Sequence, residues 1–201
     1  DFVSMAAHEL RTPLTTIKSF LSVFIQENYT AMKDEQRTFL SKIYSSTIQL
    51  AFLIENLLDV TKIEKGVFMV KMSPVDWIPF IRPIVRDFSL RAEEKHITLD
   101  LIEPLRPISK VNVDSIQISE VLVNLLANAI SYTPAGGAIT VQVEENPQGG
   151  IVTHVKDTGE GIPPEALPNL FTKFFRVVGK LTHGTKGTGL GLYISKSIIE
   201  K

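Results

Sequence analysis

Residues Ser4–Leu14 read SMAAHELRTPL and open a helical pattern that accounts for the first third of the chain. Apolar side chains recur at steps of three and four residues, at Val3, Ala7, Leu10, Leu14, Ile17, Leu21 and Phe24. This spacing places them on one stripe of an α-helix. Pro13 lies inside the pattern, and its ring would clash with the carbonyl of Glu9, next to His8. We therefore expect a long helix with a weak point beside His8.

The same spacing returns after a polar break at residues 27–30. The second set is Leu40, Ile43, Thr47, Leu50, Ile54, Leu57 and Thr61. Two such segments predict an antiparallel helical hairpin. Further apolar side chains lie off the stripe, at Phe20, Val23, Ile48 and Phe52. Two helices cannot bury all of them, so we expect a homodimer in which residues 1–65 of two chains form a four-helix bundle. His8 lies one position past the stripe, which predicts a place on the water-facing flank of the bundle.

The composition narrows the class of protein. Hydrophobic residues make up 44% of the 201, enough for a packed core, and a net charge of -1 gives no electrostatic reason to expect nucleic acid. The chain has no cysteine, which excludes disulfides and thiolate metal sites. No apolar run approaches the roughly 20 residues of a membrane span. We expect no membrane segment in this chain and a cytoplasmic location, with any sensor or membrane anchor of the parent protein before Asp1.

From Gly66 onward the pattern changes to short, mixed elements. Strands are expected at 67–70, 96–102, 139–143 and 151–155, and helices at 76–95, 114–132 and from about 190. Ser73–Pro74 reads as a turn, while Asp76 and Asp114 are suitable helix N-caps. The mixture predicts an α/β sandwich with helices on one face of a largely antiparallel sheet. The fold class is therefore α+β, with domains at 1–65 and 66–201.

Three clusters in the second domain suggest chemistry. Asn124 and Asn128 lie four residues apart on one helix face, and their amide oxygens suit a hard cation such as Mg²⁺. Residues 157–161, DTGEG, join a carboxylate that can accept an amine hydrogen bond to glycines that permit close approach. Residues 184–192, GTKGTGLGL, lead into a helix N-terminus, which favours phosphate. Taken alone, the two asparagines could be a solvated helix face and residues 157–161 a tight turn. The glycine loop at 184–192 is weak evidence by itself. An exposed His8, taken alone, is most often a plain surface residue.

In this order the clusters resemble the catalytic core of a two-component sensor histidine kinase, and the resemblance covers essentially the whole chain. Residues 4–14 resemble the phospho-acceptor box, residues 124–128 with Tyr132–Thr133 the asparagine box, residues 157–161 the first glycine box, Phe171 with residues 174–176 the phenylalanine box, and residues 187–192 the second glycine box. Chance agreement of five ordered motifs is negligible.

The resemblance implies a dimerisation and phosphotransfer domain at 1–65, followed by an ATP-binding domain. It implies that His8 is the nucleophile, that Glu9 bonds the other ring nitrogen, and that Arg176 meets the charge on the γ-phosphoryl group. Thr12 matches the position from which this family orients a water for dephosphorylation. The phosphoryl group would pass to an aspartate on a response regulator.

The resemblance also implies a set of residues that bind ATP with Mg²⁺. Asp157 would hold the adenine amine, and Asn128, helped by Asn124, would ligate the cation. The full set is Asn124, Asn128, Tyr132, Asp157, Gly159, Gly161, Lys173, Gly187, Thr188, Gly189, Leu190 and Gly191.

The chain departs from the family pattern at three points. Ser131 stands where the family usually has Lys, Gln117 where many members have Arg, and the closing strands expected after Lys201 are missing. Ser131 favours one alternative, a degenerate dimeric scaffold that binds nucleotide without kinase activity. Another alternative is an ATPase with the same nucleotide fold, such as a chaperone or topoisomerase subunit. The upstream hairpin with its histidine box argues against that ATPase.

Overall fold

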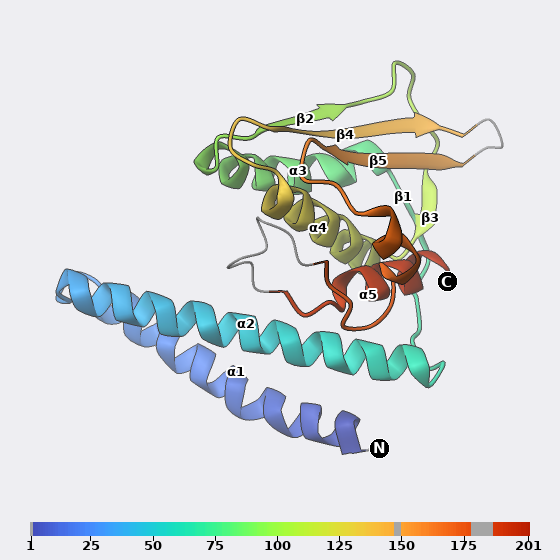
Figure 1. Ribbon diagram of the computed structural model, residues 1–201. Helices are drawn as coiled ribbons and strands as arrows, with labels where there is room; N and C mark the ends of the chain where they lie inside the picture. The colour runs from blue at the N-terminus through green and yellow to red at the C-terminus, as the bar shows by residue number, and fades with distance from the viewer. Residues whose placement is uncertain (1, 147–149, 178–186) are drawn as a thin grey trace. The chain divides into compact units, whose positions relative to one another are not determined.

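The computed structural model describes residues 2–146, 150–177 and 187–201, and of residues 2–4 and 8 the backbone only (Figure 1). The chain divides into two compact units, Asp1–Phe68 and Met69–Lys201. No helix in these ranges combines the length and the apolar content that a membrane crossing requires.

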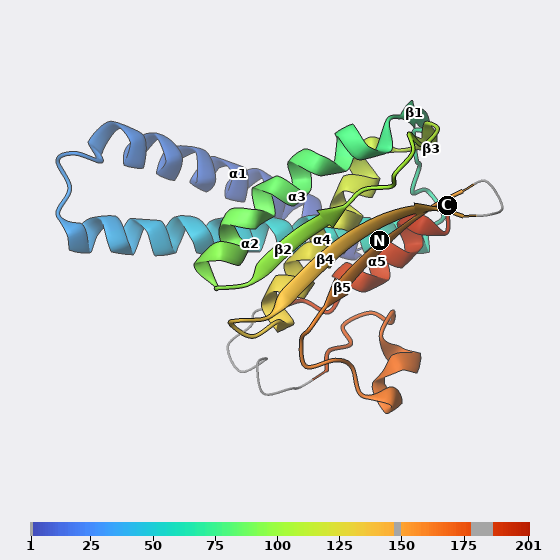
Figure 2. The same cartoon turned by 90° about the horizontal axis from the view of Figure 1, so that it is seen from above.

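The first unit is the expected helical hairpin. Helix α1 spans Phe2–Asn28 and helix α2 spans Asp34–Glu64, and the two run side by side in both views (Figures 1 and 2). Their buried contact consists of Ala7, Leu14, Ile54 and Leu58. Three of these four lie on the predicted stripes, but the stripe positions Leu10, Ile17, Phe24, Ile43 and Leu50 are 49–55% exposed, so the stripes face each other only in part. Helix α1 continues through Pro13. The predicted position of the His8 side chain lies outside the described residues.

Helix α2 ends in a Schellman motif. Gly66 has a φ of 67°, in the left-handed region that favours glycine. The N–H of Gly66 donates to the Ile63 carbonyl, and the N–H of Val67 donates to the Lys62 carbonyl, both at 3.0 Å. These bonds satisfy the last carbonyls of the helix and turn the chain out of the first unit.

The second unit packs two of its helices on one face of a sheet, as Figure 2 shows for α3 (Trp77–Glu94) and α4 (Ser115–Tyr132). The sheet has the order β2 (Thr98–Ile102), β4 (Ala138–Glu145), β5 (Ile151–Asp157). The core between the layers contains Ile81, Val85, Phe88, Leu122, Leu126, Val141 and Val143. A 3₁₀ turn, Pro164–Asn169, and helix α5, Gly191–Ile199, follow. The predicted mixed fold with helices on one face is confirmed.

Of the two pairings in this sheet, one is antiparallel, as predicted, and one is parallel. Strands β4 and β5 form an antiparallel hairpin, but β2 and β4 run parallel. The reason is the connection, because the chain from β2 to β4 passes through helix α4, and a crossover of this kind returns the chain in the same direction.

Two predictions near the start of this unit are wrong. Residues 67–70 form no strand, and the predicted turn at Ser73–Pro74 lies instead in strand β1, Ser73–Val75. Strand β1 pairs antiparallel with β3, Val111–Val113, a strand that the sequence pattern did not predict. Within the described residues β1 pairs only with β3, so Pro74 can occupy it without removing a hydrogen bond from a central ladder.

Candidate nucleotide site and phospho-acceptor helix

Helix α4 carries both asparagines, and Asp114 fixes its N-terminus. One carboxylate oxygen of Asp114 accepts hydrogen bonds from the backbone N–H groups of Ile116 and Gln117, at 3.0 and 3.2 Å. The other oxygen accepts from the backbone N–H of Lys71 at 2.7 Å. The Lys71 hydrogen bond is the largest cause that lowers the pKa of Asp114; burial opposes it, and the weaker bonds from the Gln117 and Ile116 N–H groups lower the pKa further. The predicted cap at Asp114 is confirmed.

The predicted cap at Asp76 is only half right. Asp76 stands at the N-cap position of α3, but its side chain makes no capping hydrogen bond. Its carboxylate lies 3.2 Å from the ammonium group of Lys110 instead.

The C-terminal end of α4 is held from outside by Lys95. Its ammonium group donates to the backbone carbonyls of Ile130, Ser131 and Thr133 at 2.6, 3.0 and 3.1 Å. These are carbonyls of the last turn, which has no basic residue of its own. A cation at this place complements the negative end of the helix dipole. Lys95 thereby fixes the turn against which the first glycine box lies.

The first glycine box lies against this turn. Asp157 ends β5, and one of its carboxylate oxygens accepts a hydrogen bond from the Gly159 N–H at 2.8 Å. A Cβ on Gly159 would stand 2.5 Å from the Tyr132 carbonyl oxygen, so only glycine fits between the two segments. Gly161 has a φ of 70°, which also favours glycine. The structure therefore brings Tyr132, Asp157 and Gly159 together.

The second glycine box lies against the phenylalanine box. Gly189 has a φ of 70°, and a Cβ there would stand 2.6 Å from the Phe174 carbonyl carbon. The hydroxyl of Thr188 accepts a hydrogen bond from the Leu190 N–H at 3.1 Å, just before α5 begins. Both segments thus converge on the N-terminus of α5. The predicted phosphate loop begins at Gly184, and its residues 184–186 lie outside the described residues.

Two cationic side chains border this segment. The Arg176 guanidinium passes the backbone of Gly187, with Nε 3.7 Å from where a Cβ would stand. The Lys173 ammonium lies 5.7 Å from the centre of the Tyr193 ring, on α5. Positive charge therefore lies beside the glycines that would approach a phosphate chain.

The two asparagines differ in their surroundings. The Asn124 amide nitrogen donates to the Ser195 hydroxyl at 2.9 Å, and its oxygen packs on Gly191. Asn128 is half-buried, and no hydrogen bond joins its amide to another described residue. Its oxygen is therefore available to a ligand. No group of three or more His, Cys, Asp or Glu side chains in the described part of the chain could hold a metal.

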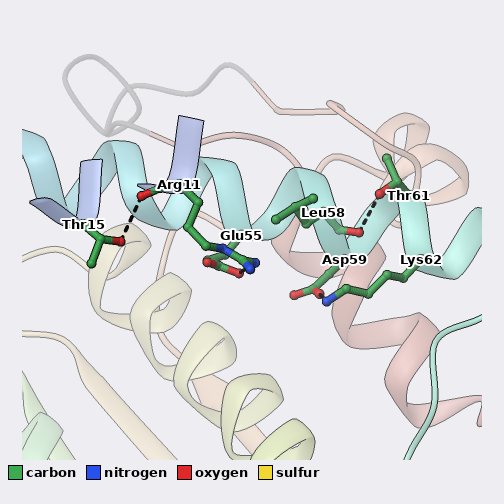
Figure 3. A network of polar contacts seen from close by, with 7 residues as sticks. All are labelled: Arg11, Thr15, Glu55, Leu58, Asp59, Thr61 and Lys62. Carbon is green, nitrogen blue, oxygen red and sulfur yellow. Dashed lines mark hydrogen bonds and ion pairs between the residues drawn. The ribbon is translucent and has the colours of Figure 1, made fainter. Parts of the chain in front are cut away.

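In the first unit, the turn after His8 is tied to the second helix (Figure 3). The Arg11 guanidinium lies 2.6 Å from the Glu55 carboxylate on α2. The hydroxyls of Thr15 and Thr16 donate to the carbonyls of Arg11 and Thr12, at 2.9 and 3.1 Å. Such bonds from a side chain back to the helix often accompany bends. Thr12 and Glu9 are exposed on α1, as their predicted roles require.

Two family models match the chain. Residues 1–66 match the His Kinase A (phospho-acceptor) domain. Residues 113–201 match the histidine kinase-, DNA gyrase B- and HSP90-like ATPase. The two matches fall in the hairpin and in the α/β unit respectively.

Relatives and solved structures agree with these matches. The non-motile and phage-resistance protein of Caulobacter vibrioides is 36% identical over 203 residues, which cover 99% of this chain and 24% of that protein. Sensor histidine kinase WalK of Bacillus subtilis is 32% identical over 201 residues, covering 100% of this chain and 32% of WalK. This chain therefore spans a third or less of the length of these two relatives.

Two solved structures, one of them of a histidine kinase, resemble the chain over nearly its whole length. Full-length ShkA, in complex with AMPPNP, matches 98% of this chain and 40% of its own with a TM-score of 0.75 and 27% identity. AdeS of Acinetobacter baumannii matches 96% of this chain and 86% of its own with a TM-score of 0.64 and 25% identity. Fold and site together define a class, the catalytic cores of two-component kinases. The chain belongs to the sensor histidine kinase family, with a phospho-acceptor hairpin followed by a histidine kinase-type ATPase domain.

Proposed function

We propose that this chain autophosphorylates His8 with ATP and then passes the phosphoryl group to an aspartate of a response regulator. One observation carries the nucleotide part of the proposal. In the second unit, α4 meets the Asp157–Gly161 loop at its C-terminal end and the start of α5 at Asn124, and each contact has a glycine, Gly159 or Gly191, where a Cβ would have no room. The acceptor part rests on the histidine box of α1 and its match to the phospho-acceptor domain.

The nucleotide would lie with its adenine at Asp157 and its phosphates at α5. One oxygen of Asp157 already accepts the Gly159 N–H, which orients the carboxylate and leaves the other oxygen for the exocyclic amine. The first N–H groups of α5 have no partner inside the helix and, with the helix dipole, favour phosphate oxygens. Arg176, beside Gly187, and Lys173, above the Tyr193 ring of α5, add positive charge near the start of this helix.

The residues present also fit a magnesium ion that arrives with the nucleotide. The Asn128 amide oxygen would be its protein ligand, with the remaining positions left to phosphate and water. When bound, Mg²⁺ neutralises charge on the phosphates, which lowers the barrier to phosphoryl transfer.

The chemical step needs a neutral ring nitrogen on His8. An imidazole with an ordinary pKa near 6.5 provides one at neutral pH. That nitrogen attacks the γ-phosphorus, the new N–P bond forms as the bond to the β,γ-bridging oxygen breaks, and ADP leaves with that oxygen. Glu9 would accept a hydrogen bond from the other ring nitrogen and stabilise its growing positive charge. Thr12 would orient a water in the reverse, dephosphorylating reaction.

We further propose that residues 1–65 form the dimer. Helix α1 exposes apolar side chains along one face, and Phe20 is 73% accessible to solvent. Ile17, Phe20, Val23 and Phe24 line one hollow on this surface, and Ile43 and Leu50 of α2 line a second. Exposed apolar area of this extent in a hairpin favours a second copy over water.

Incubation with γ-labelled ATP and Mg²⁺ tests the proposal. We expect an acid-labile label on the protein that disappears in His8→Ala, while ATP binding persists. His154→Ala is the matched control, because His154 is a half-exposed histidine that pairs with Glu144 on the sheet, and it should label normally. ATP hydrolysis without label would favour the ATPase alternative, and binding with neither would favour the scaffold. Label that persists in His8→Ala would overturn the acceptor assignment.

A further inference from the structure

Asn124 faces helix α5 through both ends of its amide. The nitrogen donates to the Ser195 hydroxyl at 2.9 Å, and Ser195 is only 6% exposed. The oxygen packs so closely on Gly191 that a Cβ there would stand 2.3 Å from it. We infer that Asn124 is a positioning residue, which holds α5 and the glycines before it against α4, and is not a ligand of Mg²⁺. The inference rests on the proposed nucleotide site and corrects the predicted role of Asn124 within it.

The contact of Asn124 with Ser195 and Gly191 is here called the clamp. The surroundings of Asn124 fit this clamp better than a metal site. A magnesium ligand stands about 2.0–2.1 Å from the ion, and the ion needs a nearly octahedral shell around it. The backbone of Gly191 closes one side of the Asn124 oxygen, and the bond to Ser195 fixes the plane of the amide. Asn128, one turn further along α4, has neither restriction from the described residues.

The clamp matters because α5 is short and carries the proposed phosphate donors. A nine-residue helix has little stability of its own, so packing must hold it. Leu190, Ile194 and Ile198 supply buried apolar contacts. Asn124 and Ser195 add the directional contact, which sets the position of α5 along α4. Loss of the clamp should let the start of α5 shift, and nucleotide should then bind more weakly whether or not Mg²⁺ is present.

Nucleotide titrations of the full chain, with Mg²⁺ and with EDTA, separate the two roles. We expect Asn124→Ala and Ser195→Ala each to weaken ADP binding about threefold to tenfold under both conditions. The double variant should bind ADP no more weakly than the single variant with the lower affinity, because each substitution removes the same Asn124–Ser195 hydrogen bond. If Asn124→Ala alone abolishes the gain from Mg²⁺ and Ser195→Ala is silent, Asn124 is a ligand and the inference fails. Circular dichroism of each variant checks that it is folded.

Asn128→Ala distinguishes failure of the clamp from failure of the proposed metal site. It should abolish the gain from Mg²⁺ and leave binding in EDTA unchanged. If it keeps the gain, the proposed metal ligand is wrong, while the clamp is still judged by the coupling between Asn124 and Ser195.

Gly191→Ala gives a second, independent test. In the unmodified chain the new Cβ should push the Asn124 amide off Ser195 and weaken binding as Asn124→Ala does. In the Asn124→Ala background there is no amide to displace, so the same substitution should have little further effect. Equal losses in both backgrounds would overturn the clamp.

Discussion

The ammonium group of Lys95, at the end of α3, lies 2.6 Å from the Ile130 carbonyl oxygen, in the last turn of α4. It also bonds the carbonyls of Ser131 and Thr133. Three carbonyls at the end of one helix thus share a single charged donor from its neighbour. This contact fixes the end of α4 that meets Asp157 and Gly159.

Replacing Lys95 by Met should destabilise the second unit. The methionine keeps most of the apolar stem but leaves three carbonyls without their donor, so the free energy of unfolding should fall by about 1–3 kcal/mol. Denaturant unfolding followed by the fluorescence of Trp77, the one tryptophan, measures this. Lys110→Met is the matched control, because Lys110 makes an exposed ion pair with Asp76, for which about 0–1 kcal/mol is typical. Similar losses in the two variants would contradict the role of Lys95.

Asp114 should make the stability of the second unit depend on pH. Its pKa is lowered in the folded state, chiefly by the Lys71 N–H, so the ionised form stabilises the fold. The contribution is complete above the ordinary Asp value, near pH 4, and is lost as pH falls through the lowered folded pKa. Asp114→Ala should cost about 1 kcal/mol at neutral pH, as lost caps usually do. The difference between the two proteins, measured by denaturant unfolding, should shrink below about pH 4. A difference that stays constant down to pH 2 would refute this.

The sequence predicted the regular parts of the fold because their signals are local. The apolar stripe through Ala7 and Leu14 and the cap at Asp114 are each read within a few residues. Strands β1 and β3 have three residues each, too few for alternation to show, and Pro74 argues for a turn.

The candidate site also has parts with local sequence signals and parts without them. The motifs identified segments that meet, since the two glycine boxes place Gly159 against Tyr132 and Gly189 against Phe174, where the backbones come close. They did not identify Lys95 or Ser195, because their partners lie 35 to 38 and 71 residues away and the bonds depend on how the helices pack. The same packing separates Asn124 from Asn128, which look equivalent in sequence.

Two leucines of α2 should separate dimerisation from folding of the hairpin. Leu50 is 49% exposed, whereas Leu57 packs against the buried contact of α1 and α2. In the proposed dimer, Leu50→Asp would bury an unpaired charge and should shift the chain to monomer with little loss of helix. Leu57→Asp should also lower the helix content, because it disturbs the hairpin itself. Light scattering and circular dichroism at micromolar concentration measure both. If the unmodified chain is already a monomer there, the dimer proposal fails.

Ser131→Lys should strengthen nucleotide binding. The Ser131 hydroxyl donates to the Ala127 carbonyl at 2.7 Å and adds no charge to the site. If this position faces the phosphates, as the family pattern implies, a lysine there adds a cation near them. A unit charge pair about 4 Å apart gains roughly 4 kcal/mol at an effective dielectric of 20, before desolvation and ordering costs. Those costs, and the Lys95 ammonium already bonded to the same turn, should reduce the net gain to about 1 kcal/mol, or several-fold in affinity.

The matched control is Ser197→Lys, six residues after Gly191. The Ser197 hydroxyl makes the same kind of bond to the carbonyl four residues before it, that of Tyr193, at 2.9 Å. ATP titrations of both variants decide the question: equal affinities would mean that residue 131 does not face the phosphates.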